Sequence, residues 1–216
     1  METPDFSHID PDLVYEPRED SFLLLDALER DLELIKNLRP TIACEIGPGS
    51  GIILAALSKV LGTSCFCLGI DVSAYACETT KVTFTRNRYG NSFDVLNMDL
   101  LSGLRLQSKA KFDVLVFNPP YVCCEESEEI DPNNGLLDKT WNGGAKGTNT
   151  LDRLILDLDK LMAPSGLFYV VAISKNDIVR LSERISKRGF SAPTVVKERK
   201  IIGEHLHVLR FQRLEN

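Results

Sequence analysis

The sequence alternates between short apolar runs of strand length and longer stretches with helical spacing of apolar residues. The expected strands cover residues 41–46, 64–70, 93–98, 111–117, 167–173, 193–198 and 206–212. The expected helices cover residues 21–37, 50–61, 73–89, 151–162 and 177–188, and a turn over residues 164–166 follows the fourth of them. Alternation of this kind predicts βαβ units, which means a mostly parallel sheet with helices on both of its faces.

The length and composition fit one domain. The chain has 216 residues, of which 44% are apolar and 26% are charged, so it can bury a core without disulfides. No linker or internal repeat divides it, and we expect a single domain over residues 1–216. Charges interrupt every apolar run before it reaches the roughly 18–20 residues of a membrane-spanning helix. The acidic N-terminus lacks the apolar core of a signal peptide, so we expect a cytoplasmic or nuclear protein without a membrane partner.

The cysteines and histidines bear on a metal site. Four of the six cysteines lie among apolar residues, where a thiol behaves as a small apolar side chain: Cys44, Cys65, Cys67 and Cys77. Cys123 and Cys124 are adjacent to each other. There is no C-x-x-C pair, and the three histidines are far from any cysteine in the sequence: His8, His205 and His207. We therefore expect buried thiols and no metal site within the chain.

The charges are unevenly distributed along the chain. Residues 1–33 carry eleven acidic residues against two arginines, whereas residues 175–213 carry ten basic residues against four acidic ones. The formal net charge of −6 disfavours a phosphate backbone as a partner, although a local basic segment can still contact one. The simpler interpretation is a solvated helix face near the N-terminus and charged strand ends near the C-terminus.

Acidic residues and glycines lie at the ends of the first three expected strands. Residues 47–51 read Gly-Pro-Gly-Ser-Gly, which lets the backbone turn tightly beside a ligand but differs from G-x-G-x-x-G and from a P-loop. Asp71 can accept hydrogen bonds from two ribose hydroxyls, and Asp99 can accept one from an adenine amine. A structural glycine turn and a helix N-cap role for Asp71 are the alternatives. Because parallel strands end at one edge of a sheet, these acids and Glu45 together predict a nucleoside site.

The fourth strand ends in Asn118-Pro119-Pro120-Tyr121, the most specific signal in the sequence. The prolines fix φ near about −65° and lack N–H groups, so the carbonyls of Asn118 and Pro119 are free to accept hydrogen bonds. The Asn118 side chain adds an acceptor oxygen, and the Tyr121 ring adds a flat wall. This array suits a planar –NH2 group on an sp² carbon, as in a carboxamide or an adenine.

Together, residues 45–51, Asp71, Asp99 and residues 118–121 make the chain resemble S-adenosylmethionine-dependent methyltransferases of the seven-stranded class. Within that class it resembles the HemK-like glutamine methyltransferases that modify translation release factors. Residues 14–28, Val-Tyr-Glu-Pro-Arg-Glu-Asp-Ser and the apolar run that follows, are similar to the short N-terminus of the eukaryotic branch. The segment Trp-Asn-Gly-Gly-Ala-Lys-Gly at 141–147 is similar to its glycine-rich loop.

The resemblance covers essentially the whole chain. It implies an α/β, single-domain, Rossmann-like class I methyltransferase fold with a seven-stranded, mostly parallel sheet and helices on both faces, in which residues 1–20 contribute to the cofactor site. The implied contacts to S-adenosylmethionine are Ser21 to the carboxylate, Glu45 and Gly47 to the methionine part, Asp71 to the ribose, Asp99 and Leu100 to the adenine, and Asn118. The implied catalytic residues are Asn118, Pro119 and Tyr121, and the implied substrate pocket is Asn118, Pro119, Pro120 and Tyr121.

Two positions depart from the common pattern of the family. Ser21 stands where other members often have Thr, and this change keeps the hydroxyl. Pro48 stands where a small residue is more usual, which stiffens the glycine loop but leaves its three glycines intact. Neither departure implies a loss of function.

The resemblance implies methyl transfer to the side-chain nitrogen of a glutamine in the GGQ motif of a eukaryotic class I release factor. An amide nitrogen is a poor nucleophile because its lone pair is delocalised, so the acceptors of Asn118 and Pro119 would hold the amide in line with the methyl group. No strong base is needed, because the proton becomes acidic only after transfer. The resemblance also implies a heterodimer with a small zinc-binding activator subunit.

Other functions stay open on the residues alone. An adenine-N6 methyltransferase would suit residues 118–121 equally well, but it would need a basic, base-flipping surface. The segment after this motif is instead acidic: Glu125, Glu126, Glu128, Glu129 and Asp131. A lysine or histone-tail methyltransferase would use the same pocket. The glycine spacing disfavours an NAD-dependent dehydrogenase, and the intact set of site residues disfavours a non-enzymatic scaffold.

Overall fold

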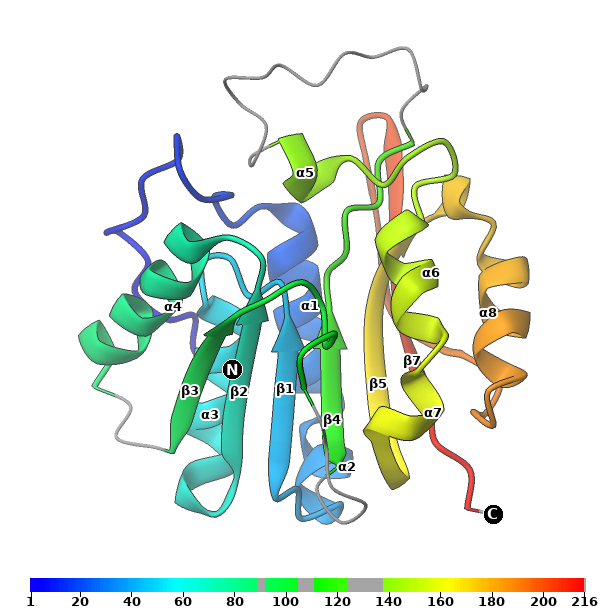
Figure 1. Ribbon diagram of the computed structural model, residues 1–216, viewed down its shortest axis with the longest axis horizontal. Coiled ribbons are helices and arrows are strands. Elements are labelled where there is room, and N and C mark those ends of the chain that lie inside the picture. Colours follow the sequence, from blue (N-terminus) through cyan, green and yellow to red (C-terminus); the bar gives the residue numbers. More distant parts are fainter. Residues whose placement is uncertain (89–91, 105–110, 124–137, 216) are drawn as a thin grey trace.

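The computed structural model describes residues 1–88, 92–104, 111–123 and 138–215. Within these residues, seven strands form one sheet in the order β3-β2-β1-β4-β5-β7-β6 (Figure 1). The strands are β1 (Ile42–Ile46), β2 (Phe66–Asp71), β3 (Phe93–Asn97), β4 (Phe112–Phe117), β5 (Met162–Ile173), β6 (Thr194–Ile201) and β7 (Glu204–Gln212). The first five are parallel, whereas β7 is antiparallel to β5 and β6. The predicted mostly parallel, seven-stranded sheet is confirmed.

Helices cover both faces of the sheet, as predicted (Figure 1). They are α1 (Glu19–Arg30), α2 (Leu32–Asn37), α3 (Ile52–Leu61), α4 (Ala74–Arg86), α5 (Asp138–Trp141), α6 (Asn149–Ile155), α7 (Leu158–Leu161) and α8 (Ile178–Ser186). Because successive side chains of a strand point to opposite faces, Val114 and Val116 of β4 pack in one core with α1 and α3. Leu115 and Phe117 pack in the other core with α6, α7 and α8. None of the helices in the described ranges is long and apolar enough to cross a bilayer.

The sequence predicts one helix over residues 21–37, whereas the structure has two, α1 and α2, separated at Asp31. The Asp31 carboxylate accepts hydrogen bonds from Tyr169 Oη at 3.0 Å and from Arg210 Nη1 at 2.6 Å. These partners lie 138 and 179 residues further along the chain. The break therefore coincides with a tertiary contact that local spacing does not reveal.

A second boundary differs near the fourth predicted helix. Residues 151–162 form α6 and α7, and β5 begins at Met162, so the predicted turn over residues 164–166 lies within a strand. Ser165 has φ of 61°, and its N–H donates to the Arg213 carbonyl at 3.1 Å. The Arg213 N–H donates in turn to the Gly166 carbonyl at 2.8 Å. The chain that follows β7 thus holds this irregular segment in the sheet.

The acidic N-terminal and basic C-terminal segments lie side by side. Arg199 of β6 pairs with Glu19 and Asp26 of α1, at 3.0 Å from the latter. Arg210 of β7 pairs with Asp31 at 2.6 Å. The charged helix face and the charged strands therefore meet where α1 packs on β6 and β7, and the side chains that pair with Arg199 remain about half exposed.

The cysteines follow the prediction as far as the structure describes them. Four are buried thiols: Cys44, Cys65, Cys67 and Cys77. Cys123 is partly buried, and Cys124 lies outside the described residues.

Candidate active site

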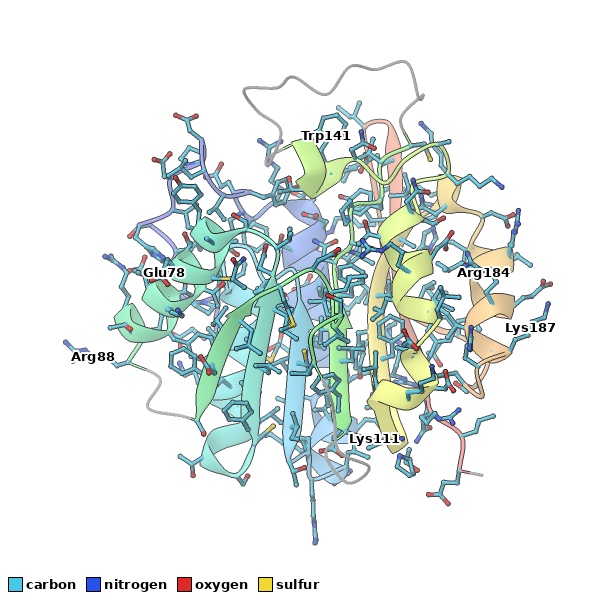
Figure 2. All side chains as sticks on the ribbon, in the orientation of Figure 1. Glu78, Arg88, Lys111, Trp141, Arg184 and Lys187 are labelled. Atoms are coloured by element: carbon cyan, nitrogen blue, oxygen red, sulfur yellow. The ribbon has the colours of Figure 1, made fainter. Side chains whose placement is uncertain are left out.

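A cavity of about 440 Å³ opens at the carboxyl ends of the parallel strands, beside β1 and β4, where the strand order reverses. All the residues predicted for the site line this cavity: Ser21, Glu45, Gly47, Asp71, Asp99, Leu100, Asn118, Pro119, Pro120 and Tyr121. Tyr15 and Asp20, from the N-terminal segment expected to contribute to the cofactor site, also line it, as do Trp141 and Arg153, to which the sequence analysis gave no individual role. Trp141, from α5, lies above the strand ends (Figure 2).

The glycine loop after β1 depends on close contact with α4. Gly47 and Gly51 have φ of 64° and 78°, a region that side chains with a Cβ rarely adopt. A Cβ on Gly51 would lie 2.8 Å from the Thr80 Cα. The Thr80 hydroxyl donates to the Gly49 carbonyl at 3.1 Å, which fixes the loop on the helix. The structure therefore gives the glycines a structural reason, and it also leaves the loop backbone open to the cavity.

Asp71 holds the same loop from the end of β2. One carboxylate oxygen accepts from the Ser73 N–H at 2.8 Å, and the other accepts from the Gly49 N–H at 3.2 Å. The N-cap of α4 is Ser73, whose hydroxyl accepts from the Ala76 N–H at 3.3 Å. Burial raises the pKa of Asp71. Asp71 thus supports the loop and also presents a carboxylate to the cavity.

Glu45 is a buried acid with an unused acceptor. Its side chain is only 2% exposed, and its Oε2 atom has no hydrogen-bond partner among the described residues. Burial, with a smaller contribution from Asp71, raises the pKa of Glu45 to about 8. A buried carboxylate oxygen without a partner is costly, so a cationic group that donates a hydrogen bond to Oε2 would be favoured there.

The predicted adenine acid has a basic neighbour. Asp99 is paired with Arg153 of α6 at 2.6 Å, and Leu100 beside it has φ of 49°. Both side chains of the ion pair are about half exposed and line the cavity.

The acidic residues at 125–131, which argue against a nucleic-acid substrate, lie outside the described residues.

The side chain of Asn118 is oriented by Asp20, a buried residue at the start of α1. The Asn118 Nδ2 group donates to Asp20 Oδ2 at 2.9 Å. A carboxylate only accepts hydrogen bonds, so the amide must turn its NH2 group toward Asp20 and its oxygen away from it. Asn118 Oδ1 is buried and has no partner in the described part of the chain. Asn118 therefore offers a free acceptor at the cavity.

Two tyrosines complete this arrangement. The hydroxyl groups of Tyr121 and Tyr15 lie 3.3 Å and 3.4 Å from the oxygens of Asp20 and donate to them. Burial, followed by the charge of Asp20, raises the pKa of both tyrosines. Both phenols therefore stay protonated near neutral pH and act as donors, not as bases.

The glycine-rich loop at 141–147 supports the backbone of the motif at 118–121. Asn176 Nδ2 donates to the Tyr121 carbonyl at 2.9 Å and to the Lys146 carbonyl at 3.2 Å. A Cβ on Gly147 would lie 2.2 Å from the Tyr121 carbonyl oxygen, so only glycine fits there. Asn176 and Asp20 are the positioning residues that the sequence interpretation missed. Asp20 adjoins Ser21 in the segment that carried the resemblance, whereas no sequence pattern marked Asn176.

Comparison with known proteins agrees with this geometry. The profile of the family described as methyltransferase small domain matches residues 20–131. The chain is 35% identical to "Methyltransferase HEMK2" of Mus musculus, over 93% of this chain and 90% of the mouse protein. It is 34% identical to "eRF1 methyltransferase catalytic subunit mtq2" of Schizosaccharomyces pombe, over 94% and 90% respectively.

A solved structure is also similar to this chain. The E. cuniculi Mtq2-Trm112 complex is described as responsible for methylation of the eRF1 translation termination factor. Its matched chain is 26% identical and has a TM-score of 0.66, over 93% of this chain and 98% of that chain.

Proposed function

Because the chain belongs to the methyltransferase small domain family and to its HemK-like group, we propose that it methylates a glutamine side chain of a eukaryotic class I release factor. The methyl donor is S-adenosylmethionine, and the acceptor is the amide nitrogen of the glutamine in the GGQ motif. Two related proteins support this substrate: the fission yeast relative is named for eRF1, and the solved complex is described as methylating it.

The residues at one end of the cavity fit the cofactor. When bound, S-adenosylmethionine supplies an activated methyl group. Its ammonium group suits the unpartnered Oε2 atom of Glu45, and its ribose hydroxyls suit Asp71. The backbone at Gly47 lets the methionine part lie close, since no Cβ intervenes. Ser21 would contact the carboxylate, and Asp99 with Leu100 would contact the adenine.

Asn118 is the proposed catalytic residue, because its Oδ1 atom is a buried acceptor without a partner in the described residues. A substrate amide can donate one proton to this oxygen and the other to the Pro119 carbonyl. These two hydrogen bonds fix the direction of the amide nitrogen, and positioning of this kind can supply several kcal/mol of the barrier. Pro120 and Tyr121 line the same pocket. Asp20 keeps Asn118 in the required orientation.

We also propose that the chain works with a small zinc-binding activator subunit. The solved Mtq2-Trm112 complex supports a two-subunit assembly. Co-expression with such a subunit should raise the yield of soluble, active enzyme. A chain that is equally soluble and active alone would contradict this part of the proposal.

The substrate can be identified by mass spectrometry. The enzyme is incubated with a purified eukaryotic release factor and S-adenosylmethionine carrying a labelled methyl group, and the digested protein is sequenced. The label should be on the GGQ glutamine. It should be absent when that glutamine is replaced by glutamate, and it should be strongly reduced when Asn118→Ala enzyme is used. Label on lysines of protein tails, or on adenines of added DNA or RNA, would overturn the proposed substrate.

A further inference from the structure

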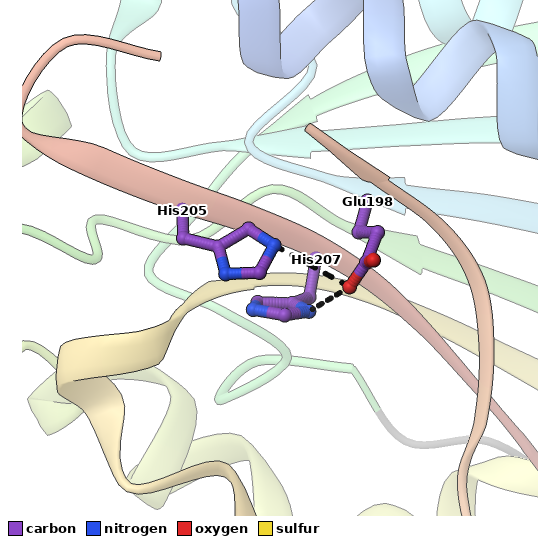
Figure 3. A group of neighbouring side chains, drawn as sticks. All are labelled: Glu198, His205 and His207. Carbon is purple, nitrogen blue, oxygen red and sulfur yellow. Dashed lines mark ion pairs between the residues drawn. The ribbon is translucent and has the colours of Figure 1, made fainter. Parts of the chain in front are cut away.

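Two histidines and a glutamate form a cluster on the last hairpin of the sheet, outside the cavity described above (Figure 3). His205 and His207 are two residues apart on β7, so their side chains point to the same face. Glu198 of β6 is the direct neighbour of His207 across the antiparallel pair. The strand register therefore brings three side chains with metal-binding atoms together on one face of the hairpin.

The distances in this cluster match those between ligands of one ion. Glu198 Oε2 lies 3.3 Å from His205 Nε2 and 3.5 Å from His207 Nδ1. All three ligand atoms lie within 4.8 Å of one another. Two ligands that bind one tetrahedral zinc ion at about 2.0–2.2 Å are about 3.3–3.5 Å apart. An ion can therefore be placed between these atoms without a large movement of the backbone.

The histidine nitrogens are set up for such an ion. His205 Nε2 is buried and makes no aligned hydrogen bond to any residue in the described ranges, although Glu198 is near it. His207 is 9% exposed, and its Nε2 lies 3.0 Å from the Ser174 hydroxyl. That contact leaves Nδ1 directed at Glu198, as expected when a polar neighbour orients a ligating histidine.

Space for a fourth ligand lies beside the cluster. A second cavity borders His205 and is also lined by Ser174, Gly203 and Glu204. A water molecule can occupy this side of the ion, which would complete a tetrahedron with three protein ligands. Two imidazoles and one carboxylate are a typical donor set for zinc.

From this geometry we propose that Glu198, His205 and His207 bind a zinc ion that links β6 to β7. The expectation of no metal site rested on cysteine spacing, and an H-x-H pair on a strand is a weak pattern by itself. The third ligand comes from the neighbouring strand, so only the register of β6 and β7 completes the site. The ion would fix the edge strand that carries Arg199, the partner of α1.

The proposal is tested by metal binding. The full chain is prepared with the activator subunit if solubility requires it, and bound metal is removed. Zinc is then added back in competition with a chromophoric chelator. Any zinc of the partner cancels, because each variant is compared with wild type prepared in the same way. Wild type should bind one more zinc ion than His205→Ala or His207→Ala. The affinity of wild type for this ion should be at least about 100-fold higher than that of either variant. Ser174→Ala should weaken binding by about 10- to 100-fold.

Matched controls separate this site from other zinc ligands. His8→Ala removes the remaining histidine, and a double Cys123→Ser, Cys124→Ser variant removes the adjacent thiols; both should bind zinc as wild type does. Cobalt in the wild-type site should give the visible absorption of a tetrahedral ion without a thiolate charge-transfer band. Glu198→Gln is the second probe, because this side chain is 58% exposed and its replacement by a residue of the same size should leave folding intact.

Three results would overturn the proposal. They are unchanged zinc affinity in the double His205→Ala, His207→Ala variant, unchanged affinity in Glu198→Gln, and loss of zinc in the cysteine variant. Circular dichroism of each variant identifies any that fails to fold, and Glu198→Gln then decides the outcome.

Discussion

The two ends of the active-site cavity are built in different ways. At the proposed cofactor end, the loop at 47–51 and Asp71 follow neighbouring strands, and the Gly49 N–H joins them by donating to the Asp71 carboxylate. At the substrate end, Asn118 is oriented by Asp20, which lies 98 residues earlier in the chain. The first end uses glycines and carboxyl groups beside the strand ends, whereas the second needs side chains from α1 and the end of β4 to meet. From this difference we expect cofactor affinity and reaction rate to depend mainly on separate sets of residues.

The largest expected effect comes from the substrate end. Asn118→Ala should lower the single-turnover rate by about 10²- to 10³-fold, because it removes an acceptor that acts on the reacting amide. Affinity for S-adenosylmethionine should change far less, since a contact made in the transition state affects the rate. Asn118→Asp keeps the size and should likewise bind cofactor without turning over. If Asn118→Ala retained a tenth of the wild-type rate, residues 118–121 would be structural only.

At the cofactor end, the expected loss is in binding. Asp71→Ala should weaken S-adenosylmethionine binding by about 1.5–3 kcal/mol, because it removes a charged acceptor for the ribose and a support of the glycine loop. Calorimetry measures this change directly. Asp71→Asn is the matched variant, and it should lose less because it keeps one acceptor for the Gly49 N–H. An unchanged affinity of the alanine variant would show that Asp71 does not contact the ribose.

A smaller expected effect tests whether Asp20 acts by orienting the Asn118 side chain. Asp20→Asn places a hydrogen-bond donor beside Asn118, so the side-chain amide of Asn118 is free to flip. The barrier of the methyl transfer should rise by about 1–2 kcal/mol, which lowers the rate. Glu19→Gln, the exposed neighbour that pairs with Arg199, is the control and should have nearly wild-type turnover. Saturating substrate should not restore the rate of Asp20→Asn. A variant that loses cofactor affinity as strongly as rate would show that the two ends are not independent.

The last expected effect is a pH dependence of cofactor affinity. The pKa of Glu45 is raised to about 8, so this carboxyl is protonated below that pH and must lose the proton to pair with the ammonium group of the cofactor. Affinity should therefore rise with pH by at most about tenfold per unit up to about pH 8, and then level off. Calorimetry between pH 6 and 8 should show this slope, flattened in Glu45→Gln. Equal slopes in both proteins would assign the dependence to another group.

The two ends of the cavity also differ in how far local sequence patterns can predict them. The alternation of apolar strands and helices was sufficient for the sheet, because burial on both faces leaves a clear apolar pattern. Glu45, Asp71 and Asn118 could be placed together for a related reason: each ends a parallel strand, and these ends meet at one edge. This local reasoning was enough to place these three residues at the cavity, whereas the contacts of Ser21 and Leu100 were implied only by the family resemblance.

Only the tertiary structure decided the contacts between distant segments. The orientation of Asn118 by Asp20, the support of Tyr121 by Asn176 and the pairing of Asp99 with Arg153 join elements that no sequence period relates. The break between α1 and α2 at Asp31 belongs to the same group. So does the cluster of Glu198, His205 and His207, which exists because β6 and β7 pair in one register. Local patterns fix which face of an element is buried, but the pairing of side chains across elements depends on how those elements pack, and the folded chain alone determines that.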